Sequence, residues 1–149
     1  MRRDGVPGGV TELLWYPARL YPPELVGGAR IGSYGPRYEG NSVEDWPTVT
    51  FPALAAEVRI PVRFTVGDHE RVWRNDPEAL AEVANRFTAA PRVVLNIQPN
   101  SGHNLSMGHT AAAYHLGLLA FVEEAAVARS TGEFHGPAIQ FNGATQEEN

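Results

Sequence analysis

Two polar turns follow apolar runs in this chain, and between them they carry the residue types of an acid–base pair. Glu70 ends the turn Gly67-Asp68-His69-Glu70, and His103 ends the turn Asn100-Ser101-Gly102-His103. A carboxylate that binds one imidazole nitrogen fixes the tautomer of the ring and stabilises the imidazolium that forms during proton transfer. The other ring nitrogen can then accept the proton of a hydroxyl nucleophile. These residue types favour hydrolysis by a serine–histidine–acid triad.

Both turns follow segments with the pattern of β-strands. The β-branched and aromatic run over residues 59–66 predicts one strand, and residues 91–97 predict the next. Between them Asp76 and Pro77 predict a helix start, as N-cap and first helical residue. A further helix is expected over residues 110–128. This alternation favours an α/β fold with parallel strands, whose carboxyl ends meet at one edge of the sheet, so Glu70 and His103 are expected to meet there.

The segments 59–73 and 91–115 resemble the C-terminal part of an α/β-hydrolase fold enzyme. The resemblance is to the actinobacterial esterase, lipase and thioesterase-like hydrolases in particular. It rests on the two apolar strands that end in Gly-Asp-His-Glu and in Asn-Ser-Gly-His. It implies a partial α/β-hydrolase fold, with the last parallel strands and helices of the sheet, and hydrolysis of an ester, thioester or amide without a cofactor. By position, Glu70 matches the acid of the family and His103 matches its base.

Two carboxylates compete for the role of the acid. The family more often has aspartate at the fourth position of this turn, where this chain has Glu70. Asp68 lies two residues earlier and is the rival acid. The sequence favours Glu70 as the acid, and Asp68 remains the alternative.

The nucleophile of such a triad is missing. The family places it in a Gly-x-Ser-x-Gly turn ahead of the acid, and no such pentapeptide occurs here. Only Ser33 and Ser42 precede the acid, and the nearest match, Gly32-Ser33-Tyr34-Gly35, has the wrong spacing and is followed by Pro36 where a helix should begin. We therefore expect the acid and base half of a hydrolase, inactive alone. The alternative is a non-catalytic binding or interaction module derived from the same fold.

Composition divides the chain into three segments. Residues 1–52 hold most of the prolines and glycines, which predicts an irregular, cap-like segment over a pocket, or a surface loop whose aromatic rings pack on a neighbouring core. Residues 53–129 are expected to form the hydrolase core portion, and residues 130–149 a disordered tail. No predicted strand precedes residues 59–66, so the edge of that strand is expected to be exposed and able to pair with another chain or a second copy.

Composition also excludes several functions. The chain of 149 residues has no cysteine and a net charge of −5, which excludes thiolate chemistry and disfavours nucleic acid. His109 and His115 are too far apart in sequence for paired ligands on one helix face, so no metal site is expected. Uninterrupted apolar runs stay below the ~18 residues of a membrane span. We expect a cytoplasmic protein with a small ester-like substrate, no nucleic-acid partner and no membrane span.

Overall fold

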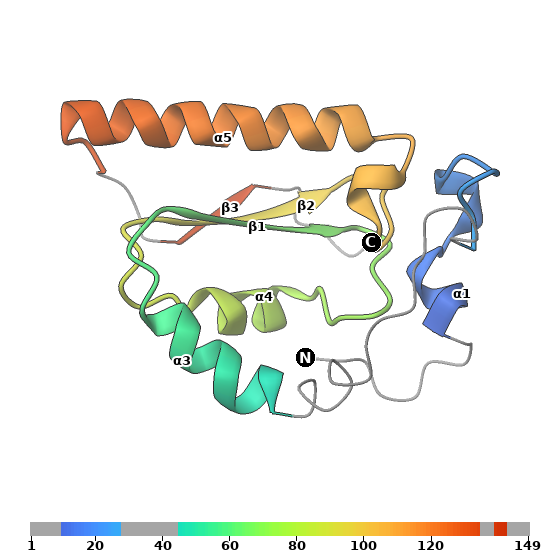
Figure 1. Ribbon diagram of the computed structural model, residues 1–149, viewed down its shortest axis with the longest axis horizontal. Helices are drawn as coiled ribbons and strands as arrows, with labels where there is room; N and C mark the ends of the chain where they lie inside the picture. Colours follow the sequence, from blue (N-terminus) through green and yellow to red (C-terminus); the bar gives the residue numbers. More distant parts are fainter. Residues whose placement is uncertain (1–9, 28–44, 135–138, 143–149) are drawn as a thin grey trace, which may run out of the picture.

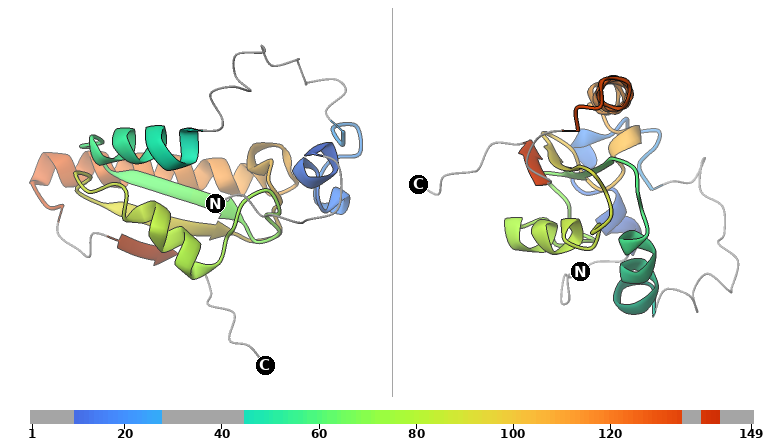
Figure 2. Two further views of the ribbon diagram at one scale, coloured as in Figure 1. Left: turned by 90° about the horizontal axis from the view of Figure 1, so that it is seen from below. Right: turned by 90° about the vertical axis from the view of Figure 1, so that its left-hand side faces the viewer.

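The computed structural model describes residues 10–27, 45–134 and 139–142, and within them one small parallel sheet organises the fold. Its strands are β1 (Val62–Gly67), β2 (Val93–Gln98) and β3 (Ile139–Asn142), in the order β1-β2-β3. Helix α5 (Ala111–Thr131) covers one face, whereas α3 (Phe51–Ala56) and α4 (Pro77–Ala84) lie on the other side (Figures 1 and 2). The chain therefore has a mixed, loosely α/β architecture.

The layer between the sheet and α4 is the apolar core. Alternate side chains of β1 and β2 point to this face because the side-chain period of a strand is two. The buried cluster consists of Val66, Leu80, Ala84, Val93 and Leu95. Helix α4 starts with Asp76 as its N-cap, as the sequence predicts, and the Asp76 side chain accepts the N–H of Ala79 at 3.0 Å. Each buried Leu or Val side chain stabilises the fold by about 1.5–3 kcal/mol, so this layer gives the strand ends a firm base.

The layer between the sheet and α5 is more polar. Arg63 lies on β1 with its guanidinium against Gly117 of α5, and Arg92 forms an ion pair with Glu124 at 3.6 Å. No residue of α5 is fully buried, and the large apolar side chains Leu116, Leu119 and Val122 are more than half exposed. The helix therefore presents large apolar side chains on its outer side. Helix α5 is long and apolar enough to cross a membrane by length and composition alone. Single helices of soluble proteins also meet these two criteria.

The prediction of a disordered tail from residue 130 is wrong for part of that segment. Helix α5 continues to Thr131 and ends at Gly132, whose φ of 74° gives a left-handed C-cap. Strand β3 then pairs in parallel with β2, with Ile139 opposite Val93. Apolar Ile139 and Phe141 alternate with polar residues in the sequence, but a run of four residues between glycines and a proline is too short to predict a strand. Residues 135–138 and 143–149 lie outside the described part.

The N-terminal segment lies at the carboxyl ends of β1 and β2. Helix α1 (Val10–Leu14) and the short η1 (Ala18–Leu20) are placed there, beside the strand ends (Figure 1). The rings of Trp15 and Tyr21 are 7% and 2% exposed and meet edge to face, with centroids 5.2 Å apart. At these two positions the rings are buried, and the Tyr21 hydroxyl accepts the N–H of Asn104 in the loop after β2. Farther along, η2 (Trp46–Thr50) runs directly into α3.

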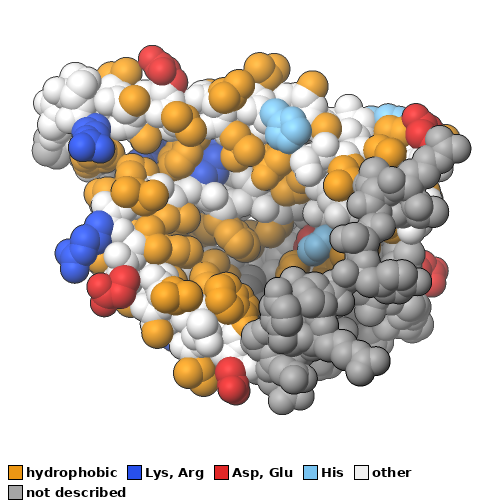
Figure 3. Space-filling model, in the orientation of Figure 1, with side chains coloured by type: hydrophobic (Ala, Val, Ile, Leu, Met, Phe, Trp, Pro, Cys, Tyr) orange, Lys and Arg blue, Asp and Glu red, His pale blue; other side chains and the backbone are white. Residues whose placement is uncertain are grey.

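One edge of the sheet has no partner strand among the described residues, because β1 pairs only with β2. Hydrophobic side chains gather on this side of the molecule, between α5 and α3 (Figure 3). Beside this edge Ile60 is 67% exposed and Leu54 of α3 is 55% exposed. The bare edge agrees with the lack of a predicted strand ahead of β1.

Candidate active site

Glu70 and His103 meet at the carboxyl ends of β1 and β2. The two strands are parallel and in register from Val62 opposite Val93 to Gly67 opposite Gln98, so the chain leaves both at the same edge. Nδ1 of His103 lies 2.9 Å from Oε2 of Glu70. The Glu70 side chain is 4% exposed, whereas the His103 side chain is 25% exposed. The structure thus brings together the two residues that the sequence singled out, with the carboxylate inside and the imidazole reaching solvent.

The Glu70 carboxylate is fixed by the backbone of its own turn. Its Oε1 accepts the N–H of Val72 at 2.6 Å and that of Trp73 at 3.2 Å, while Oε2 faces His103. Burial raises the pKa of the Glu70 carboxyl by desolvation, but the hydrogen bond and charge of His103 and the two backbone N–H groups outweigh that effect. The net result is a pKa below the ordinary value. Glu70 is therefore a charged, oriented partner of the imidazole.

Asp68, the rival acid, contacts the backbone rather than His103. Its Oδ2 accepts the N–H of Asn100 at 2.8 Å, and its Oδ1 accepts the N–H of Ser101 at 2.9 Å. The N–H of His69 in turn donates to the carbonyl of Ser101 at 2.9 Å. These bonds connect the turn at residues 67–73, which we name the Glu70 turn, to residues 99–104, which we name the His103 loop. The geometry makes Glu70 the carboxylate in contact with His103, and Asp68 the residue that joins the two loops.

Two glycines allow the backbones to come this close. A Cβ on Gly67 would collide with the carbonyl of Ser101, and one on Gly102 would collide with the Tyr16 carbonyl and the Tyr21 hydroxyl. Gly102 is not among the residues with positive φ. Glycine is needed here for a steric reason, because a side chain at position 102 has no space.

None of the described serines is hydrogen-bonded to His103. Ser101 is 3% exposed, donates to the Pro99 carbonyl at 3.1 Å and shares a hydrogen bond with the Thr110 hydroxyl at 2.6 Å. Ser106 and Ser130 are exposed, and Ser33 and Ser42 lie outside the described residues. Within the described part of the chain, Nε2 of His103 has no hydrogen-bond partner. A hydroxyl at that nitrogen would complete a triad.

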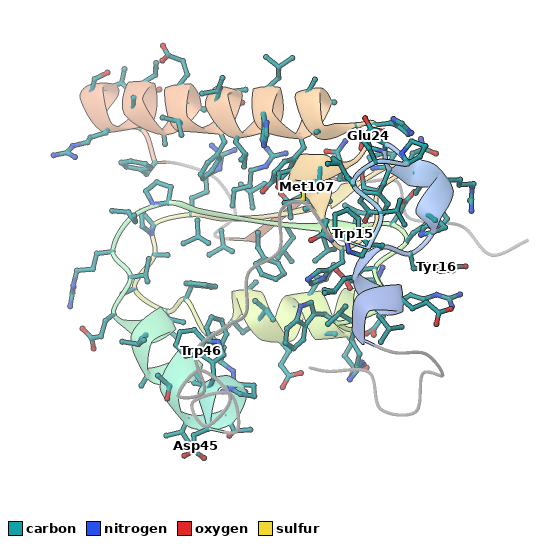
Figure 4. All side chains as sticks on the ribbon, turned by 45° about the vertical axis from the view of Figure 1, so that its right-hand side comes forward. Trp15, Tyr16, Glu24, Asp45, Trp46 and Met107 are labelled. Atoms are coloured by element: carbon teal, nitrogen blue, oxygen red, sulfur yellow. The ribbon has the colours of Figure 1, made fainter. Side chains whose placement is uncertain are left out.

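The structure adds residues to the site that the sequence did not identify. The Tyr21 hydroxyl accepts the N–H of Asn104 at 3.2 Å, and the Asn104 amide donates to the Leu14 carbonyl at 2.9 Å. Figure 4 shows Trp15 between the N-terminal segment and the sheet, with Tyr16 farther out. The concentration of aromatic residues was the one available signal, and it did not indicate which ring would reach the site.

The described residues hold no group of three or more histidine or acidic side chains that could bind a metal ion. His109 and His115 lie on the loop before α5 and on α5 itself, and both are exposed. No protein-family model, no curated protein and no solved structure matches this chain. The chemistry of the site therefore has to be argued from its geometry.

Proposed function

We propose that this chain supplies the acid and base of a hydrolytic triad that acts on an ester, thioester or amide. The observation that carries the proposal is the 2.9 Å contact between Nδ1 of His103 and the buried Glu70 carboxylate. Nε2 of the same ring has no hydrogen-bond partner among the residues that the structure describes. Glu70 holds the tautomer in which Nε2 is the basic nitrogen. The lowered pKa of Glu70 keeps this carboxyl charged, so it can stabilise the imidazolium that proton abstraction creates.

The nucleophile in this proposal is a serine hydroxyl of a separate, nucleophile-bearing half. It would lose its proton to Nε2 as it attacks the carbonyl carbon, and the imidazolium would then return the proton to the leaving group. The arrangement at the carboxyl ends of two parallel strands agrees with the resemblance to the C-terminal part of an α/β-hydrolase, which remains our proposal for the family. On this account the chain alone is inactive and works in the cytoplasm with a nucleophile-bearing half.

A second candidate is a binding module without catalysis. It is favoured by the hydrogen bonds of Ser101, the serine of the His103 loop, with Pro99 and Thr110 rather than with His103. The exposed apolar side of α5 also favours it. In such a module the Glu70–His103 bond would only connect two loops. The bare edge of β1 would then serve association with another chain or with a second copy.

Two experiments separate the candidates. The DNA ahead of the Met1 codon is read in all frames for a Gly-x-Ser-x-Gly segment, and its presence supports a nucleophile-bearing half whereas its absence argues for the module. Separately, the purified chain is treated with a serine-directed fluorophosphonate. We expect no adduct, and an adduct on this chain alone would contradict its inactivity in isolation.

A further inference from the structure

Residues 14–21, which we name the 14–21 segment, contact both loops that carry the candidate acid and base. These contacts fall on the immediate neighbours of Glu70 and His103 in the sequence. The segment comes from the N-terminal part of the chain, far from either loop in sequence. The 14–21 segment could therefore orient the Glu70–His103 pair, or it could only contribute to packing.

The contacts with the His103 loop lie on both sides of the histidine. Before it, Gly102 packs directly on the Tyr16 carbonyl and the Tyr21 hydroxyl, with no room for a Cβ. After it, the N–H of Asn104 donates to the Tyr21 hydroxyl at 3.2 Å and its amide donates to the Leu14 carbonyl at 2.9 Å. The residues that flank His103 therefore cannot shift without breaking contacts with the segment.

The segment is anchored beyond these contacts as well. The N–H of His109 donates to the Leu20 carbonyl at 2.9 Å. Within the segment, the Trp15 ring meets the Tyr21 ring edge to face. On the side of the Glu70 turn, the Arg71 guanidinium lies over the Tyr16 ring, 3.7 Å from its centroid. A cation over an aromatic face at this distance is attractive. One segment thus bridges the residue after Glu70 and the residues around His103.

Tyr21 is the central side chain of this arrangement. It is 2% exposed, and burial raises the pKa of its hydroxyl; the N–H of Asn104 opposes the rise and the negative charge of Glu70 adds to it. The hydroxyl is therefore a neutral group that interacts electrostatically with the Glu70 carboxylate. It accepts a hydrogen bond from the N–H of Asn104 in the His103 loop.

We propose that Tyr21 and Asn104 are positioning residues, through which the 14–21 segment holds the His103 imidazole on the Glu70 carboxylate. The role rests on the proposed function, in which that pair is the catalytic acid and base. Neither residue takes or gives a proton in the reaction. They act by fixing the loop from which His103 extends, so that Nδ1 stays bound to Glu70 and Nε2 stays directed away from it.

The test uses the full chain by itself and needs no turnover. An imidazole N–H bonded to a buried carboxylate is protected from water and gives a separate downfield proton resonance. We expect this resonance for Nδ1–H of His103 in the wild type, and its loss in His103→Ala. Tyr21→Phe and Asn104→Ala should each lose or broaden it, and in each the pKa of Glu70, followed by carboxyl carbon NMR, should rise toward its ordinary value. Tyr114→Phe, on α5 with its ring near His115, is the matched control and should leave both readouts unchanged.

The outcomes separate this inference from the function on which it rests. If the wild type lacks the resonance, the Glu70–His103 pair itself fails, and the proposed function fails with it. If the wild type shows it and both folded variants keep it with an unchanged Glu70 pKa, the segment is only structural and the inference is overturned, even if the melting temperature falls. If circular dichroism shows that Tyr21→Phe does not fold, Asn104→Ala decides the test, because this variant keeps the buried ring and the hydroxyl of Tyr21.

Discussion

The Asp68 carboxylate accepts the backbone N–H of Ser101 at 2.9 Å, and this bond fixes the spacing of the two loops that carry Glu70 and His103. The same carboxylate also accepts the N–H of Asn100. The two acidic residues of one turn thus have separate contacts: Asp68 binds backbone and Glu70 binds the imidazole. This separation makes their roles distinguishable by substitution.

Asp68→Ala should lower the free energy of unfolding by about 1–3 kcal/mol, because two backbone N–H groups lose a charged acceptor. The low pKa of Glu70 should persist, since its own contacts with His103, Val72 and Trp73 remain. Urea unfolding and carboxyl carbon NMR measure the two quantities. A Glu70 pKa that rises as far in Asp68→Ala as in His103→Ala would show that Asp68, too, belongs to the pair.

Glu70 should make stability fall at acid pH. Its pKa is lower in the folded than in the unfolded chain, so the unfolded state takes up a proton first as the pH drops. The stabilisation is therefore complete above the ordinary pKa of 4.5 and is lost as the pH falls through the folded value. Urea unfolding of wild type and Glu70→Gln between pH 7 and about pH 3 measures the difference.

The control for this pH dependence is Glu82→Gln, which removes an exposed carboxylate from an i,i+4 ion pair with Arg86 at 3.6 Å. Such surface pairs contribute little. The free energy of unfolding of Glu82→Gln should follow the wild-type pH curve, whereas that of Glu70→Gln should fall less steeply at acid pH. Parallel curves for wild type and Glu70→Gln would contradict the ionised, hydrogen-bonded state of Glu70.

Gly102→Ala and Gly117→Ala should change stability in opposite directions. At Gly102 the new methyl collides with the Tyr16 carbonyl and the Tyr21 hydroxyl, so the free energy of unfolding should fall by about 1–3 kcal/mol. At Gly117, inside α5, the nearest atom is the flexible end of Arg63 at 3.2 Å, and alanine should stabilise the helix by about 0.5–1 kcal/mol. Thermal unfolding tests both, and a neutral Gly102→Ala would mean that the His103 loop does not pack closely on the 14–21 segment.

The exposed side of α5 should govern solubility rather than stability. Leu116 and Leu119 are 65% and 66% exposed, so Leu116→Gln with Leu119→Gln should raise the soluble yield and change the free energy of unfolding by no more than about 0.5 kcal/mol. Leu80→Ala, in the core against β1 and β2, should cost about 2–5 kcal/mol. A cost of that size for the α5 double variant would show that another element covers this side of the helix.

The sequence predicted the strand–helix–strand order and the meeting of Glu70 with His103, because both follow from local patterns. Asp76 and Pro77 mark a helix start by their own chemistry, and strand ends are marked by glycine and proline. The partner of Asp68, the packing of Gly102 and the contact of Tyr21 with Asn104 could not be predicted, since each joins segments far apart in sequence. The face of α5 that meets the sheet could not be predicted either, because large apolar residues such as Leu116, Leu119 and Val122 lie exposed on its outer side.

The central claim is that His103, supported by Glu70, is the base for a serine hydroxyl of a separate, nucleophile-bearing half. It is tested most directly by labelling cells that produce the tagged chain from its own locus with a fluorophosphonate, and by identifying the modified serine in the recovered assembly. We predict an adduct that forms about 10²–10⁴-fold more slowly with His103→Ala and at the wild-type rate with the exposed His115→Ala. No adduct, or one that forms equally fast with His103→Ala, would contradict the account.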